Sequence, residues 1–434
     1  MDKSVRLRLI VMNVLQWAAW GAYLTSMGSY LASVGLGSKI GLFYAMQGIV
    51  SIFMPAIMGA VADKYVSAQK LLGLCHALAG VAMLGAGYYG MQAGADVSFA
   101  ILFSLYSFSV AFYMPTIALS NSVAFKILEK NGYDTVKDFP PIRVFGTVGF
   151  IAAMWVVNFM KDGAGISFQN TYWQFIVSGI FGVAMFVYCF TLPDCPANRA
   201  AGKTSWADIF GLKSFSLFKD SQMAVFFIFA MLLGVALQIT NSFANPFIGH
   251  FAIFPEFQDA WGAQNANALI SISQMSETLG ILLIPVAMKY FGIKRVMLIS
   301  MFAWVLRFGL FGLGDPGAGV WMFILSMIVY GVAFDFFNIS GALYVNMRTT
   351  DKIQSSAQGL FMMMTNGIGA AVGTLSAQAV INCFTHEEVV NGMKYLVGGW
   401  DKAWYVFAGY AMLVAIAFMF AFKDPGKGPL KKIA

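Results

Sequence analysis

Apolar residues recur along the chain in blocks, separated by short segments rich in charged residues, proline or glycine. A helix of about twenty residues rises about 30 Å, which is the thickness of the hydrocarbon core of a bilayer. The pattern therefore predicts twelve membrane-spanning helices. Their centres lie near Trp20, Phe53, Val81, Phe112, Met154, Phe181, Leu237, Glu277, Trp304, Phe334, Gly369 and Val414.

Composition supports this interpretation. Of the 434 residues, 59% are hydrophobic and 11% are charged, whereas soluble domains carry about 25% charged residues. We therefore expect an all-α membrane protein that contacts the lipid bilayer. The net charge of +7 lies in short segments between apolar blocks, which indicates membrane topology and not a nucleic-acid partner. The sequence contains no phosphate-binding loop and no metal-ligand cluster, so we expect no enzyme activity, no cofactor and no metal.

The distribution of positive charge predicts the orientation in the membrane. If the N-terminus is cytoplasmic, most of the 27 lysines and arginines fall in cytoplasmic segments, as the positive-inside rule requires. Both termini are then cytoplasmic. The longest polar stretch, 193–222, predicts a cytoplasmic linker between an N-terminal six-helix half, 1–192, and a C-terminal six-helix half, 223–434.

A faint repeat relates the two predicted halves. Lys64-Tyr65 is followed by Lys70, and Lys289-Tyr290 is followed by Arg295 at the same offset. Parallel six-helix repeats are the architecture of major facilitator transporters. The first of these loops resembles the conformational loop signature of that superfamily, carried here by Gly59, Asp63, Lys64 and Lys70, although its second glycine is missing.

Four ionisable side chains lie inside predicted spans: Arg143, Glu277, Arg307 and Asp335. Each would cost at least ~2.5 kcal/mol at the centre of a lipid-facing helix, so each should face protein or a water-filled cavity. Structural ion pairs and a functional site are both compatible with this pattern. For Arg307, which lies between Leu306 and Phe308, we favour a structural role.

Polar neighbours at helical spacing favour a functional site. They are Gln238, Asn241 and Asn245 on the seventh span, Gln274 and Glu277 on the eighth, Arg143 and Thr147 on the fifth, and Asp335 and Asn338 on the tenth. Isolated amides can also serve as interhelical hydrogen bonds. Aromatic residues accompany the stripe, and together amides and rings suit a flat, hydrogen-bonding solute.

Two other features have simpler interpretations. His76 in the third span is more easily explained as a satisfied packing residue than as a proton relay. Gly367, Gly369 and Gly373 form a small-residue step on the eleventh span, which allows neighbouring helices to approach closely.

Several stretches resemble the bacterial nucleoside:proton symporters of the major facilitator superfamily, and the resemblance covers nearly the whole chain. The stretches are Phe139-Pro-Pro-Ile-Arg-Val-Phe-Gly-Thr147, Leu237-Gln-Ile-Thr-Asn241, Ser271-Ile-Ser-Gln-Met-Ser-Glu-Thr278 and Tyr330-Gly-Val-Ala-Phe-Asp-Phe-Phe-Asn-Ile-Ser-Gly341. Shorter matches include Leu15-Gln-Trp17 and Ser356-Ala-Gln-Gly359.

The resemblance implies proton-driven nucleoside uptake by alternating access, through a central cavity between the halves. It places Arg143, Thr147, Gln238, Asn241, Gln274, Glu277, Tyr330 and Phe334 at the nucleoside, and it makes Glu277 or Asp335 the candidate for proton coupling. Burial favours the neutral form of a carboxylic acid, which could take up a proton outside and release it inside. Expected substrates are nucleosides such as uridine or adenosine, with the proton as coupling ion, in a monomer of the bacterial inner membrane.

The alternatives are a proton-coupled symporter of another polar solute, such as a sugar or nucleobase, and a passive nucleoside facilitator. A membrane-embedded enzyme or a scaffold fits less well, because no catalytic triad is apparent.

Overall fold

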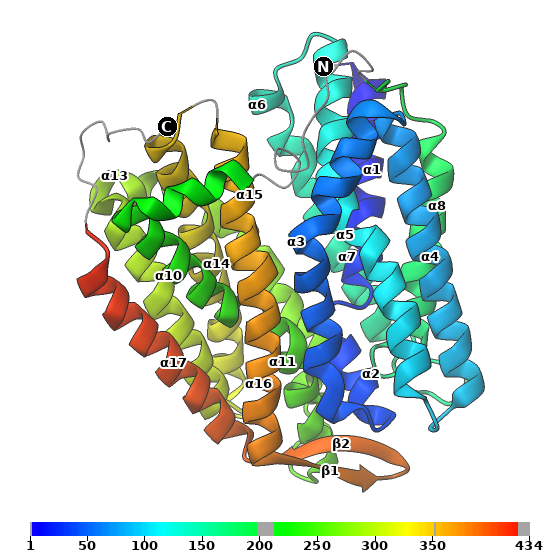
Figure 1. The fold of residues 1–434 in the computed structure, drawn as a ribbon. Coiled ribbons are helices and arrows are strands. Elements are labelled where there is room, and N and C mark those ends of the chain that lie inside the picture. The colour runs from blue at the N-terminus through cyan, green and yellow to red at the C-terminus, as the bar shows by residue number, and fades with distance from the viewer. Residues whose placement is uncertain (1, 198–211, 351–352, 424–434) are drawn as a thin grey trace. The chain divides into compact units, whose positions relative to one another are not determined.

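The computed structural model describes residues 2–197, 212–350 and 353–423, without the side chains of residues 63, 64, 136, 212, 213 and 355. Figure 1 shows that nearly all of this chain is helical. Contacts divide the chain into two compact units, one with residues 1–37 and 50–205 and one with residues 38–49 and 206–434. The predicted domain limits at 192 and 222 stay predictions, since residues 198–211 lie outside the described part.

Helices of very different lengths build the first unit. They are α1 (Lys3–Gly21), α2 (Met27–Ser33), the later part of α3 (Ile40–Lys64), α4 (Ala68–Ala93), α5 (Phe99–Lys130), α6 (Thr135–Asp138), α7 (Pro140–Phe159) and α8 (Trp173–Cys189), with the short helices η1 (Gly37–Lys39) and η2 (Phe168–Asn170) between them. The first predicted span is interrupted between α1 and α2 by hydrogen-bonded turns at residues 22–26.

The second unit contains the remaining elements. They are η3 (Leu212–Lys219), α10 (Ser221–Leu237), α11 (Ile239–His250), η4 (Phe251–Ile253), α12 (Trp261–Gln264), α13 (Ala266–Leu313), α14 (Val320–Arg348), α15 (Gln354–Met362), the π-helix η5 (Met363–Gly369), α16 (Ala370–Phe384), β1 (Thr385–Val390), β2 (Met393–Gly398) and α17 (Trp400–Ala421). The start of α3 also belongs to this unit, where the backbone N–H of Gly41 donates to Oε1 of Gln378 on α16 at 2.6 Å.

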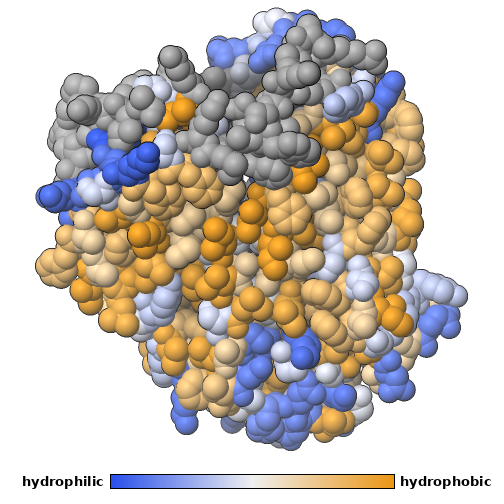
Figure 2. Space-filling view, in the orientation of Figure 1, coloured by the Kyte–Doolittle hydropathy of each residue, from blue (hydrophilic) through white to orange (hydrophobic). Residues whose placement is uncertain are grey.

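Every predicted span centre falls in a helix. Nine helical stretches of the described chain are long and apolar enough to cross a membrane. The longest, α13, contains two predicted spans that meet at Gly292, where a φ of 75° breaks the helical path. Helices α1 and α8 carry the other two predicted spans. Figure 2 shows hydrophobic side chains over the middle of the helices and hydrophilic ones toward their ends, as lipid contact requires.

A β-hairpin at residues 385–398 was not predicted. Strands β1 and β2 pair antiparallel with Val390 opposite Met393, and they follow α16 at the end remote from α15 (Figure 1). Asn391 and Gly392 form the turn with positive φ values of 51° and 79°. An Asn-Gly pair is the preferred sequence for this kind of two-residue turn, so the signal was present but short.

The predicted glycine step on the eleventh span packs against α10. A side chain at Gly369 would collide with the carbonyl oxygen of Met231, and one at Gly373 would collide with the backbone of Val235. Close approach of the two helices, as predicted, therefore depends on the absence of a Cβ atom.

An ion pair holds the start of α10. Asp220 accepts a hydrogen bond from the backbone N–H of Met223 at 2.9 Å and pairs with Arg348, the last residue of α14, at 2.9 Å. Burial opposes the charge of Asp220, but these hydrogen bonds outweigh it and lower the pKa of Asp220 below its ordinary 3.8.

Candidate functional site

The seventh predicted span breaks at its first polar residue. Helix α10 ends at Leu237 and α11 begins at Ile239, with Gln238 between them. Nδ2 of Asn241 donates to Oε1 of Gln238 at 2.9 Å, and the Ser242 hydroxyl donates to the backbone oxygen of Gln238 at 2.8 Å. Gln238 and Asn241 are half-buried, whereas Asn245 is 1% exposed. Only the first two amides of the predicted stripe thus remain partly accessible.

Gln274 and Glu277 lie half-buried on α13, three residues apart. The next helix, α14, packs against this stretch: the backbone N–H of Gly331 donates to Oγ of Ser276 at 3.2 Å. A Cβ atom at Gly331 would collide with the Ser276 backbone. Because Gly331 has no side chain, α13 and α14 approach closely here. The polar face of α13 therefore lies next to the α14 segment that carries Tyr330.

Helix α14 carries the predicted aromatic and acidic residues. The Tyr330 and Phe334 rings stack with centroids 5.5 Å apart and an interplanar angle of 10°. Tyr330 is 4% exposed, while Phe334 is half-buried. Asp335 is 4% exposed, and its Oδ2 has no hydrogen-bond partner among the described residues. A buried polar atom without a hydrogen-bond partner is energetically costly.

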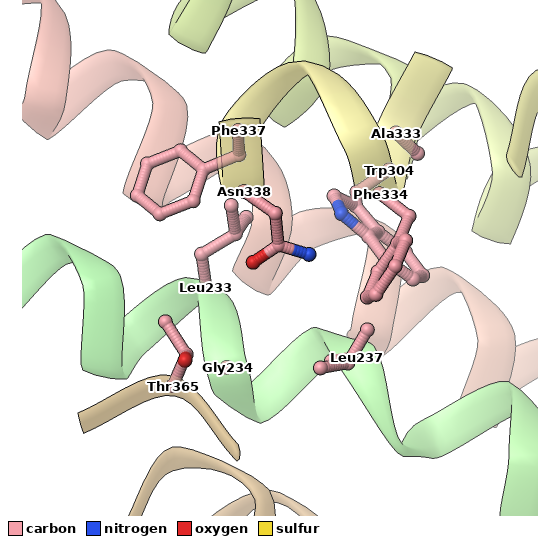
Figure 3. Close-up of a pocket in the computed structure, with 9 residues that line it drawn as sticks. All are labelled: Leu233, Gly234, Leu237, Trp304, Ala333, Phe334, Phe337, Asn338 and Thr365. Atoms are coloured by element: carbon pink, nitrogen blue, oxygen red, sulfur yellow. The ribbon is translucent and has the colours of Figure 1, made fainter. Parts of the chain in front are cut away.

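A small pocket lies beside the break at Gln238. Figure 3 shows its lining, with the Asn338 amide extended from α14 toward Leu237 on α10 and with Phe334 and Trp304 beside it. The free space is about 10 Å³, which is what a single water molecule needs. Asn338 and Phe334 therefore line the same pocket, but the pocket is too small to hold a nucleoside.

Arg307 is buried in the second unit and contacts both helices of the site. Its Nη1 donates to the backbone oxygen of Ser326 at 2.7 Å, and its guanidinium lies 3.4 to 3.5 Å from the hydroxyl of Ser273. The guanidinium carbon also lies 4.6 Å from the centre of the Tyr330 ring. These contacts agree with the structural role predicted for Arg307, and they join the helices that carry Gln274 and Tyr330.

The first unit contains the other two predicted site residues. Arg143 and Thr147 lie four residues apart on α7, and both are half-buried. The guanidinium carbon of Arg143 lies 3.8 Å from the centre of the Trp17 ring on α1. The sequence pattern did not identify this contact, because the two residues are far apart in the chain.

His76 belongs to a buried hydrogen-bond network. Its Nε2 lies 2.7 Å from Oε1 of Gln16, and Nε2 of Gln16 donates to Oγ1 of Thr116 at 2.8 Å. The Tyr113 hydroxyl donates to the backbone oxygen of Gln16 at 2.7 Å. Because Oε1 of Gln16 accepts, the proton of a neutral His76 lies on Nε2. His76 thus has a hydrogen-bond partner at Nε2, although Nδ1 has none among the described residues.

The residues of the predicted conformational loop motif lie at the end of α3 and the start of α4. Gly59 lies inside α3 with open space around its Cα, and Lys70 is exposed on α4. The side chains of Asp63 and Lys64 lie outside the described residues. A conformational role for these four residues stays a prediction.

Comparisons with known proteins identify the family of this chain. A sequence model for the nucleoside H+ symporters matches residues 3–427. The chain is 44% identical to the xanthosine permease of Escherichia coli K12 over 431 residues, covering 98% of each chain. It is 41% identical to the nucleoside permease NupG of the same organism, covering 97% of this chain and 96% of NupG.

Solved structures agree with the sequence comparisons. A crystal structure of NupG superimposes with a TM-score of 0.84 at 40% identity, covering 98% of this chain and 100% of that chain. The xylose transporter XylE of Escherichia coli, at 13% identity and a TM-score of 0.66, shares the fold alone. The predicted major facilitator fold is thus confirmed. With the family model and the relatives covering nearly its whole length, the chain belongs to the nucleoside:H+ symporter family, multi-pass membrane transporters of the major facilitator superfamily.

Proposed function

We propose that this proton-coupled nucleoside symporter binds a nucleoside such as uridine or adenosine through the polar and aromatic side chains of α7, α10, α11, α13 and α14. The proposed binding residues are Arg143, Thr147, Gln238, Asn241, Gln274, Glu277, Tyr330 and Phe334. We further propose that the protein works as a monomer with both termini in the cytoplasm. The predominance of lysine and arginine in the predicted cytoplasmic segments supports this orientation.

The hydrogen-bonded pair of half-buried amides at the helix break is the observation that supports nucleoside binding most directly. Gln238 and Asn241 hold each other at 2.9 Å, which orders two amides and so lowers the entropy cost of binding a solute. Amides both donate and accept hydrogen bonds, as the edge of a base and the hydroxyls of a ribose require. Gln238 lies at the junction of α10 and α11, with φ −91° and ψ −8°.

Aromatic and acidic residues on the neighbouring helices complete the proposed chemistry. The Phe334 ring is half-buried and braced by the Tyr330 ring, so it can stack on a base without losing much conformational freedom. The half-buried carboxyl group of Glu277 can accept hydrogen bonds from ribose hydroxyls. A sugar or a free nucleobase would contact only some of these amide, aromatic and carboxyl groups. The amides left without a hydrogen-bond partner would then weaken the binding of that solute.

Asp335 is the stronger candidate for the proton-coupling group. It is buried, and one of its carboxyl oxygens has no hydrogen-bond partner among the described residues. Such a group can be held neutral while buried and can lose its proton when water reaches it. Glu277 is the alternative, since a half-buried carboxyl group that binds the nucleoside could also couple binding to protonation.

The experiment uses purified protein in proteoliposomes with an imposed proton gradient. Asp335→Asn and Glu277→Gln are compared with Asp401→Asn, which alters an exposed acid at the start of α17. We expect at least one of the first two variants to exchange uridine across the membrane without accumulating it, and the control to accumulate it normally. Uphill accumulation by both site variants would contradict the proposal.

Calorimetry with uridine tests the amide pair. Gln238→Ala and Asn241→Ala should each weaken binding by about 2- to 12-fold, which corresponds to one net hydrogen bond. Gln92→Ala, at an exposed position on α4, should bind as the wild type does. Competition by ribose, xylose and uracil should be weak. Unchanged affinity in both amide variants would instead assign this pair to helix packing.

A further inference from the structure

Helices α1 and α7 pack with their backbones in close contact through glycines. A Cβ atom at Gly21 would overlap the backbone of Phe150, and one at Gly149 would overlap the backbone of Val14. The two helices can therefore approach this closely only where a side chain is absent. This packing brings Trp17 on α1 against Arg143 on α7.

Gly146 provides the space for the contact between Trp17 and Arg143. It lies three residues after Arg143, on the same face of α7. An added Cβ atom would lie 2.6 Å from Cδ1 of Trp17 and 2.8 Å from Nη1 of Arg143. Any side chain at Gly146 would thus displace one of the two groups. The stack at 3.8 Å depends on this glycine.

The rotation of α1 about its axis is held by the residue before Trp17. The Gln16 side chain is fixed by His76 at 2.7 Å and by Thr116 at 2.8 Å, and its backbone oxygen accepts from Tyr113 at 2.7 Å. These bonds anchor one face of α1 to α4 and α5. The adjacent residue, Trp17, is consequently turned toward α7.

A guanidinium stacked on an indole has a particular advantage at membrane depth. The face of the ring attracts the cation, and the guanidinium carbon of Arg143 lies 3.8 Å from the centre of the Trp17 ring. The contact with the ring therefore stabilises the charge and restricts where the guanidinium can lie.

We propose that Trp17 is a positioning residue for nucleoside binding: its ring holds the Arg143 guanidinium in place, within the space that Gly146 provides. This inference rests on the proposed function, in which Arg143 binds the nucleoside. It extends that function to a residue on α1 that has no assigned part in binding.

Uridine calorimetry on the purified full-length protein tests the inference. Trp17→Leu removes the ring, and Trp17→Met keeps an apolar side chain of comparable length if the leucine variant does not fold. Either should weaken uridine binding by about 3- to 30-fold, as expected for loss of a desolvated cation–π contact. Trp17→Tyr, which restores a ring face, should recover most of the affinity. Trp155→Leu, a tryptophan 43% exposed on α7, should leave affinity unchanged.

A double variant separates positioning from packing. In Arg143→Met, where no guanidinium remains, adding Trp17→Leu should weaken binding by less than about twofold, since the coupling of neighbouring groups is lost with either partner. Equal losses from Trp17→Leu with and without Arg143 would overturn the inference, as would a folded Trp17→Leu protein with wild-type affinity. Wild-type affinity in Arg143→Met would instead contradict the proposed role of Arg143 in binding.

Discussion

Replacing Gln16 by leucine tests whether the buried network around His76 stabilises the first unit. Gln16 is fully buried, and leucine has a similar volume, so the change removes hydrogen bonds and leaves little cavity. The variant loses the bond to Oγ1 of Thr116 and the partner of His76 Nε2. The imidazole would then have neither nitrogen paired with a described residue, because Nδ1 has no such partner already.

The magnitude follows from these two losses. An unsatisfied buried polar group costs about 1–3 kcal/mol, and the net value of the bond to Thr116 is about 1 kcal/mol, so Gln16→Leu should destabilise the protein by about 2–4 kcal/mol. Thr116 keeps its own bond, since its hydroxyl donates to the backbone oxygen of Tyr113 at 2.6 Å. For a unit of this size, the unfolding temperature should fall by about 5–15 °C.

The assay is thermal unfolding in detergent at one heating rate, because membrane proteins commonly unfold irreversibly. Gln92→Leu, at an exposed position on α4, is the control and should unfold near the wild-type temperature. The decisive variant combines Gln16→Leu with His76→Phe, which replaces both partners by apolar groups. Replacing both is far less costly than orphaning one. The double variant should therefore be more stable than Gln16→Leu alone, and a double variant less stable than that single one would refute the reasoning.

Three further predictions concern the second unit. The pKa of Asp220 is lowered in the folded state, so the contribution of its charge to stability should be complete above about pH 4 and should be lost as the pH falls further. The difference in unfolding stability between wild type and Asp220→Asn should therefore shrink from pH 7 to pH 3. A difference that stays constant with pH would contradict this prediction. Gly373→Ala should destabilise the protein by about 1–3 kcal/mol through overpacking. Gly409 has open space around it, so Gly409→Ala should stabilise the protein by about 0.5–1 kcal/mol. Thermal unfolding of the two variants measures both effects. Arg307→Lys loses the planar fork that reaches two serines and should lower stability by about 1.5–3 kcal/mol in the same assay; wild-type stability would show that an ammonium group suffices.

Local pattern predicted much of the fold. Each span centre read from the apolar blocks lies in a helix, because about twenty apolar residues can bury their backbone polar groups in lipid only as a helix. The glycine step at Gly369 and Gly373 indicated close packing, since a missing Cβ has the same consequence in any membrane helix. The hairpin at Asn391-Gly392 was missed, because the length of apolar blocks carries no information about a two-residue turn.

The candidate site was predicted residue by residue, but its contacts were not. Helical spacing indicated that Gln238 and Asn241 share a face, and they are hydrogen-bonded. Helical spacing did not indicate the helix break at Gln238. Intrinsic helix propensities are small, and packing against neighbouring helices decides where a span is interrupted.

What the sequence determined by itself is the membrane character of the chain, the position of its spans and the chemical types of the side chains at membrane depth. These follow from the transfer of residues between water and lipid, which depends on composition along the chain. Only the tertiary structure decided that Arg143 stacks on Trp17, that His76 pairs with Gln16 and that Arg307 lies against Tyr330. Each pair joins different helices, and the approach and rotation of two helices depend on packing over their whole length, which no local pattern records.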